Sequence, residues 1–135
     1  MNWKKFSLRE LQSIRARANE ANDLDTYIPV LREILRRCPS GPRAASVYLG
    51  LANAYFKLNQ DAQAVTALRN CVKMKSPQFE PAAWTLLGSY YARQKNWTAA
   101  RRALKQTLTR YPQAPSVRTA HSLLKHIDGI TSWKK

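Results

Sequence analysis

Apolar residues recur three and four positions apart along most of this chain, which is the spacing of an amphipathic helix. The clearest two stretches cover residues 81–94 and 97–110, with a polar break at 94–96 between them. Pro112 ends the second stretch, because proline cannot continue a helix and disfavours the helical conformation of the preceding residue. The pattern predicts two antiparallel helices joined by a short turn.

A glycine, Gly88, lies within the first of these helices, where it costs about 1 kcal/mol relative to alanine. Such a cost needs a packing reason. The second helix offers one, because it carries the small residues Ala99, Ala100 and Ala103. We therefore expect the two helices to approach closely at Gly88.

The same pattern recurs 36 residues earlier in the chain. The residues that correspond to Trp84, Leu87, Gly88, Tyr91, Ala100 and Leu104 are Tyr48, Leu51, Ala52, Tyr55, Ala64 and Leu68. Those of a weaker first copy are Leu11, Ile14, Arg15, Ala18, Tyr27 and Leu31. A period of this length predicts helical hairpins that stack on one another, here at about residues 8–39, 45–76 and 81–112.

The third hairpin resembles the tetratricopeptide repeat, in which large and small residues stand at fixed offsets. The residues that carry the resemblance are Trp84, Leu87, Gly88, Tyr91, Ala100, Leu104 and Pro112. Thr107 departs from the pattern, which prefers a small apolar residue there. The resemblance implies an all-α fold: a right-handed α-solenoid of about three helix-turn-helix hairpins and a C-terminal capping helix.

Both ends of the chain can be assigned from the same pattern. Ser7 and Glu10 have the spacing of a capping box that starts the first helix, so residues 1–7 are expected to form an N-terminal arm. A last helix over about 116–127 should cover the third hairpin. Residues 129–135 are expected to be a C-terminal tail, which leaves 8–128 as a single domain.

Composition excludes several classes of protein. The chain has 135 residues, 44% of them apolar, which suits one globular domain without a transmembrane helix or secretory signal. The two cysteines are expected to be reduced thiols in a cytoplasmic protein. His121 and His126 do not share a helical face, so no metal or other cofactor is expected. We find no catalytic motif and expect no enzyme.

The formal net charge is +15, from 23 basic and 8 acidic residues. Many basic residues fall on the second helix of each hairpin, where stacking would place them on an outer face: Arg32, Arg36, Arg69, Lys73, Arg101, Arg102 and Lys105. Three pairs of these stand four residues apart, where like charges destabilise a helix by about 0.2–0.5 kcal/mol per pair. Tolerating this repulsion indicates an external acidic partner.

The resemblance further implies a concave groove, lined by the first helix of each hairpin, that holds a peptide. By the repeat register, its residues are Leu49, Asn53, Phe56, Lys57, Thr85, Ser89, Ala92 and Arg93, with Gln12, Ala16, Asn19 and Glu20 from the first hairpin. Packing of Phe56 against the first hairpin is the alternative for that residue.

Two functions remain open from the sequence. The first is a protein–protein interaction adaptor or assembly subunit that binds an acidic partner or peptide through the groove and the basic outer face. The second is an RNA-associated protein that uses the outer arginines and lysines for phosphate contacts. Self-association through the ends of the solenoid is also open, whereas contact with a membrane surface is not favoured.

Overall fold

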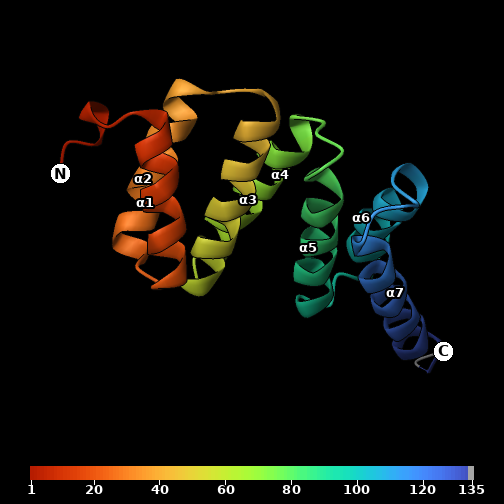
Figure 1. Cartoon of the computed structure of the whole chain (residues 1–135). Helices are drawn as coiled ribbons and strands as arrows, with labels where there is room; N and C mark the ends of the chain where they lie inside the picture. The colour runs from red at the N-terminus through yellow and green to blue at the C-terminus, as the bar shows by residue number, and fades with distance from the viewer. Residues whose placement is uncertain (134–135) are drawn as a thin grey trace. The chain divides into compact units, whose positions relative to one another are not determined.

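The computed structural model describes residues 1–133, with side chains as far as Thr131. This part of the chain contains helices and no strand, which confirms the predicted all-α class (Figure 1). The helices are η1 (Trp3–Lys5), α1 (Leu8–Glu20), α2 (Leu24–Arg37), α3 (Gly41–Lys57), α4 (Asp61–Lys73), α5 (Glu80–Arg93), α6 (Trp97–Arg110) and α7 (Ser116–Trp133).

The helices group into two compact units, Met1–Met74 and Lys75–Lys135. Unit 1 contains η1 and α1 to α4, and unit 2 contains α5 to α7. The boundary lies close to the end of the second predicted hairpin, which is expected at about residue 76. A single domain over 8–128 and a right-handed superhelical course stay predictions.

All three hairpins turn in the same way. The residues in the turns, Asn22, Asn59 and Lys95, have φ angles of 54°, 59° and 61°. In each turn the next residue donates its N–H to the carbonyl five residues back, at Ala18, Tyr55 and Tyr91. This is the Schellman ending of a helix. Its recurrence at equivalent positions supports the repeat that the apolar spacing predicts, including the weak first copy.

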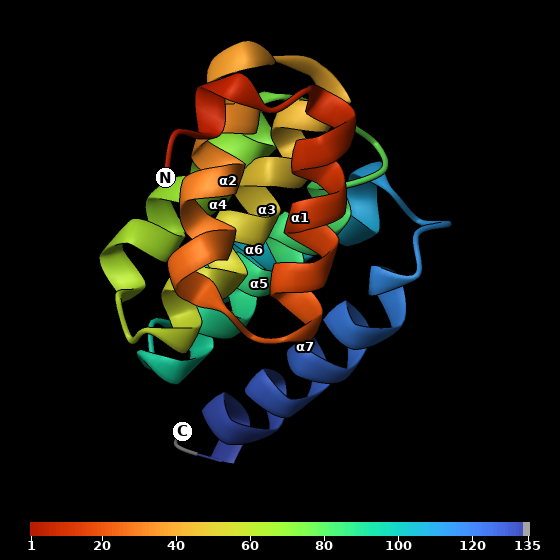
Figure 2. The same cartoon turned by 60° about the vertical axis from the view of Figure 1, so that its left-hand side comes forward.

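The N-terminal arm packs against the helices of unit 1, the unit to which it belongs. Ser7 Oγ accepts the Glu10 N–H at 3.1 Å and Glu10 Oε1 accepts the Ser7 N–H at 2.9 Å, which confirms the capping box. Before it, η1 lies beside the end of α2 (Figure 2), where Arg37 donates to the carbonyls of Trp3 and Lys4. The arm is therefore bound to the helix that ends nearest to it.

A glycine on α3 explains how the first hairpin tolerates two large residues at the small positions of the pattern. A Cβ atom on Gly50 would lie 2.7 Å from Tyr27 Oη and 3.4 Å from the guanidinium of Arg15. Arg15 also donates to Ser46 Oγ at 3.0 Å. The missing side chain of Gly50 therefore makes the room that Tyr27 and Arg15 occupy.

In unit 2 the close approach expected at Gly88 is present. A Cβ atom there would lie 2.6 Å from Leu104 Cγ and 3.4 Å from the Ala100 carbonyl oxygen. Thr107, the departure from the repeat pattern, is fully buried. Its hydroxyl donates to the Pro81 carbonyl at 3.2 Å, which satisfies the buried polar group.

The prediction of a C-terminal tail is wrong for residues 129–133, because these residues continue α7. The helix continues because its far end packs on α6: Ile127 is fully buried against Leu104. Arg101 binds Asp128 at 3.0 Å and donates to Thr131 Oγ1 at 2.5 Å. These contacts on both sides of Gly129 outweigh its low helix propensity. Lys134 and Lys135 of the predicted tail lie outside the described residues.

Candidate partner-binding surfaces

The predicted groove residues of unit 1 lie along α3. Asn53 and Lys57 are exposed, whereas Leu49 and Phe56 are half-buried. Lys57 Nζ donates to Asn22 Oδ1 at 3.1 Å, in the turn after α1. On α1, Gln12 and Ala16 line a hollow of about 520 Å³ together with two arginines, Arg9 and Arg43. Asn19 and Glu20 are exposed at the end of α1.

The predicted groove residues of unit 2 are less accessible. Thr85 is only 8% exposed, and its hydroxyl donates to the Pro81 carbonyl at 2.9 Å and lies 3.3 Å from Thr107 Oγ1 on α6. The prediction that Thr85 faces an open groove is therefore wrong, because the side chain turns into the α5–α6 hairpin. Ser89 is half-buried and Arg93 is exposed.

The basic residues of α2 are partly neutralised within the helix. Glu33 is buried and accepts from Arg36 at 2.6 Å and from Arg37 at 2.7 Å. Arg32 is exposed and donates to Tyr55 Oη at 2.5 Å. Of the three α2 arginines, only Arg32 therefore lacks a carboxylate partner among the described residues.

The Glu33 cluster makes a prediction about acid stability. Hydrogen bonds from Arg36 and then Arg37 lower the pKa of Glu33 from about 4.5 to about 2. Because the folded-state pKa is depressed, the cluster stabilises the fold above about pH 4.5, and this stabilisation is lost as the pH falls towards 2. We expect Glu33→Gln to lower the melting temperature at neutral pH but to change it little near pH 2. Glu20→Gln, at an exposed site, is the control, and equal effects at both pH values would contradict this role.

The basic residues of α6 divide in the same way. Arg101 is held by Asp128 and Thr131 of α7. Arg102 and Lys105 are exposed and form no ion pair with any residue that the structure describes. The expected repulsion between like charges four apart is weakened for Arg32 with Arg36 and for Arg101 with Lys105, because one member of each pair is bound to a carboxylate. On α4, Arg69 and Lys73 are exposed.

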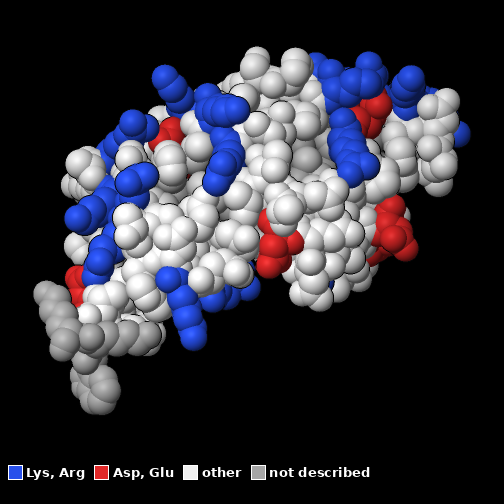
Figure 3. Space-filling model, turned by 180° about the vertical axis from the view of Figure 1, so that it is seen from behind, with Lys and Arg blue, Asp and Glu red and all other residues white. Residues whose placement is uncertain are grey.

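Unit 2 has a large surplus of positive charge. Residues 75–135 contain 11 lysines and arginines and two acidic residues, Glu80 and Asp128. Both carboxylates are used in ion pairs within the unit: Glu80 with Arg110 at 3.4 Å, and Asp128 with Arg101. Figure 3 shows blue side chains at many places over this unit and red ones at few. Arg102 and Lys105 of α6 therefore form no ion pair with either carboxylate of their own unit.

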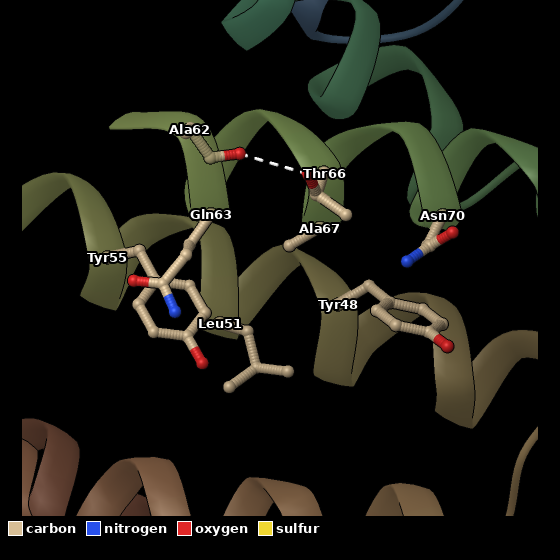
Figure 4. A pocket seen from close by; sticks show the side chains of 8 residues that line it. All are labelled: Tyr48, Leu51, Tyr55, Ala62, Gln63, Thr66, Ala67 and Asn70. Carbon is tan, nitrogen blue, oxygen red and sulfur yellow. Dashed lines mark hydrogen bonds between the residues drawn. The ribbon is translucent and has the colours of Figure 1, made fainter. Parts of the chain in front are cut away.

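A pocket of about 340 Å³ lies between α3 and α4 in unit 1 (Figure 4). It is lined by Tyr48, Leu51, Tyr55, Ala62, Gln63, Thr66, Ala67 and Asn70. Sequence reasoning missed it, because the three α3 residues belong to the repeat pattern and are expected in the core. The available signal was the run of small and polar residues on the facing side of α4, which cannot fill the space beside two tyrosine rings.

Two other kinds of site are absent from the described part of the chain. No group of three or more histidine, cysteine or acidic side chains there could hold a metal ion. The helices there are also too short or too polar to cross a lipid bilayer.

A family model described as tetratricopeptide repeat matches residues 49–115, about half of the chain. The match runs from α3 to the loop before α7, so it covers the two hairpins in which the pattern is clearest. The chain belongs to the tetratricopeptide repeat family. A search of curated proteins found no match to it.

The family assignment gives the surfaces of this tetratricopeptide repeat protein a general role. Tetratricopeptide repeats generally mediate protein–protein interactions. The residues that define their pattern pack in the core. The first hairpin lies outside the matched residues. In that hairpin Arg15 and Tyr27 stand at the glycine and alanine positions of the pattern.

Proposed function

We propose that this tetratricopeptide repeat protein is a non-enzymatic adaptor or assembly subunit that binds an acidic segment of another protein. The observation that carries the proposal is the charge of unit 2, in which both acidic side chains are already paired. Exposed cations without internal partners gain most from an external anion, because little of their charge is compensated beforehand.

The surfaces of both units support an acidic ligand. In unit 2, Arg102 and Lys105 stand three residues apart on α6, and so share one side of that helix. In unit 1, the hollow beside Gln12 and Ala16 is flanked by Arg9 and Arg43. An extended segment rich in aspartate and glutamate would meet positive charge at either place.

The proposal predicts binding of a fluorescein-labelled poly-glutamate peptide, measured by fluorescence anisotropy. Arg102→Glu combined with Lys105→Glu should weaken binding about tenfold or more, because two attractive contacts become repulsive. The control is Lys4→Glu combined with Lys5→Glu, which changes net charge equally but on the N-terminal arm. It should lower the affinity much less.

Two results would contradict the proposal. Equal losses in both double variants would mean that the peptide responds to net charge and not to a surface. Tighter binding of a single-stranded RNA than of the peptide would favour the nucleic-acid alternative. In that case log K should fall with log salt by about 0.7 for each phosphate contacted.

A further inference from the structure

The α3–α4 pocket combines an apolar floor with polar edges. In Figure 4 the side chain of Leu51 lies between the rings of Tyr48 and Tyr55. On the α4 side, the Thr66 hydroxyl donates to the Ala62 carbonyl at 3.0 Å and is therefore satisfied within its own helix. The middle of the pocket thus offers mainly carbon atoms to an occupant, which favours an apolar side chain.

Hydrogen-bond donors surround this apolar centre. Tyr55 Oη accepts from Arg32, so its own proton is directed elsewhere. Neither the Tyr48 hydroxyl nor the Asn70 amide has a hydrogen-bond partner within the described part of the chain. A phenol O–H group and an amide N–H group both donate hydrogen bonds to anions. The edge of the pocket therefore suits an occupant that brings acceptor oxygens.

The charges around the pocket are positive. Arg32 is exposed, and the hydrogen-bond partner that fixes it beside the pocket, Tyr55, is neutral. Lys73 is exposed and stands three residues beyond Asn70, on the same side of α4. The neighbouring carboxylate, Glu33, is already paired with Arg36 and Arg37. On α3 there is no acidic residue, and on α4 the one acidic residue is Asp61 at the first position.

We infer that this pocket binds one large apolar side chain of a partner protein, at a point where that side chain is flanked by aspartate or glutamate. The apolar side chain would lie over Leu51 between the two tyrosines, and a neighbouring carboxylate would bind Arg32. The inference rests on the proposed function, since it names the kind of acidic segment that is recognised. It adds a requirement that charge alone does not make: the segment must carry an apolar anchor.

Three labelled peptides separate the two requirements by fluorescence anisotropy. The first has one leucine with glutamates on both sides, the second replaces that leucine by serine, and the third replaces the glutamates by glutamines. We expect the wild-type protein to bind the first peptide about tenfold tighter than either of the others, because apolar anchors and charge-assisted hydrogen bonds each contribute on this scale.

Variants at the pocket test the location. Ala62 is exposed and lines the pocket, so Ala62→Phe should fill it and abolish the preference for leucine over serine. Ala62→Ser leaves the space open and should keep that preference. Arg32→Gln should reduce the preference for glutamate over glutamine, and the part that depends on Arg102 and Lys105 should remain. Circular dichroism shows whether each variant is folded.

The outcomes distinguish the inference from the proposed function. If wild-type protein binds the leucine and serine peptides equally, or if Ala62→Phe keeps the preference for leucine, the pocket inference is wrong. The proposed function would still stand if both glutamate peptides bind and depend on Arg102 and Lys105. If neither glutamate peptide binds, both proposals fail.

Discussion

Replacing Gly88 with alanine is expected to destabilise unit 2 by up to about 2 kcal/mol, because inserting a methyl group into a filled core costs about 1–3 kcal/mol and the gain in helix propensity offsets only part of that cost. Alanine is the better helix former by about 1 kcal/mol, but the new Cβ would lie 2.6 Å from Leu104 Cγ and Cδ2. Leu104 is fully buried and packs in a cluster with Ala100, Ala120 and Ile127, so it cannot move aside without disturbing its neighbours. The measurement is urea unfolding followed by circular dichroism.

The same substitution should have the opposite sign at Gly129. No atom lies within 4 Å of a Cβ placed there, so Gly129→Ala should stabilise α7 by about 0.5–1 kcal/mol through helix propensity alone. A stabilising effect of Gly88→Ala, equal to that of Gly129→Ala, would contradict the close approach of α5 and α6.

A double-mutant cycle tests the contact directly. Leu104→Ala alone should cost about 2–5 kcal/mol, because it leaves a cavity in a buried cluster. In that background Gly88→Ala should lose most of its cost, since the atoms that it meets are gone. Simple additivity of the two effects would show that Leu104 is not what makes glycine necessary at position 88.

Replacing Glu80 with alanine is the second large effect expected in unit 2. Glu80 is 1% exposed and accepts from Trp84 Nε1 at 3.0 Å and from Arg110 at 3.4 Å. It thereby joins the start of α5 to the end of α6. Glu80→Ala leaves the indole N–H without its acceptor, and we expect a loss of about 1–3 kcal/mol in the free energy of unfolding. Asp61→Ala, at the first residue of α4, is a control outside this cluster.

The neighbouring Tyr111 provides a second readout. Burial, and after it the hydrogen bond to Glu80, raises the pKa of Tyr111 above its ordinary value. Glu80→Ala should move that pKa back towards the ordinary value without reaching it, because the effect of burial remains. Glu80→Gln keeps an acceptor oxygen for Trp84 and should cost less stability than alanine. An unchanged Tyr111 titration in Glu80→Ala would show that the two residues are not coupled.

The helices and the repeat could be predicted from sequence because they depend on local spacing. Apolar residues three and four apart, the turn at 94–96 and the proline at 112 place α5 and α6 nearly to the residue. The end of α7 could not be predicted in this way. Asp128 and Gly129 are weak helix formers, and only the contacts of Ile127 and Arg101 across to α6 show why the helix continues.

The candidate sites were harder to predict, because a surface depends on which side chains meet across helices. Periodicity placed Thr85 on an open face, although its hydroxyl turns to Thr107 on α6. It also identified Arg36 and Arg101 as surplus charge, although each is bound to a carboxylate. The need for glycine at position 50 could not be predicted from the sequence. It arises from contact with Tyr27, which is distant along the chain.

The sequence by itself determined the all-α class, the hairpins, the repeat family and the excess of positive charge. These follow from residue type and spacing along one chain. Only the tertiary structure decided which cations are already paired and where an apolar pocket opens. Ion pairs and cavities depend on atoms brought within a few ångströms by packing, and the spacing of residues along a helix does not set those distances.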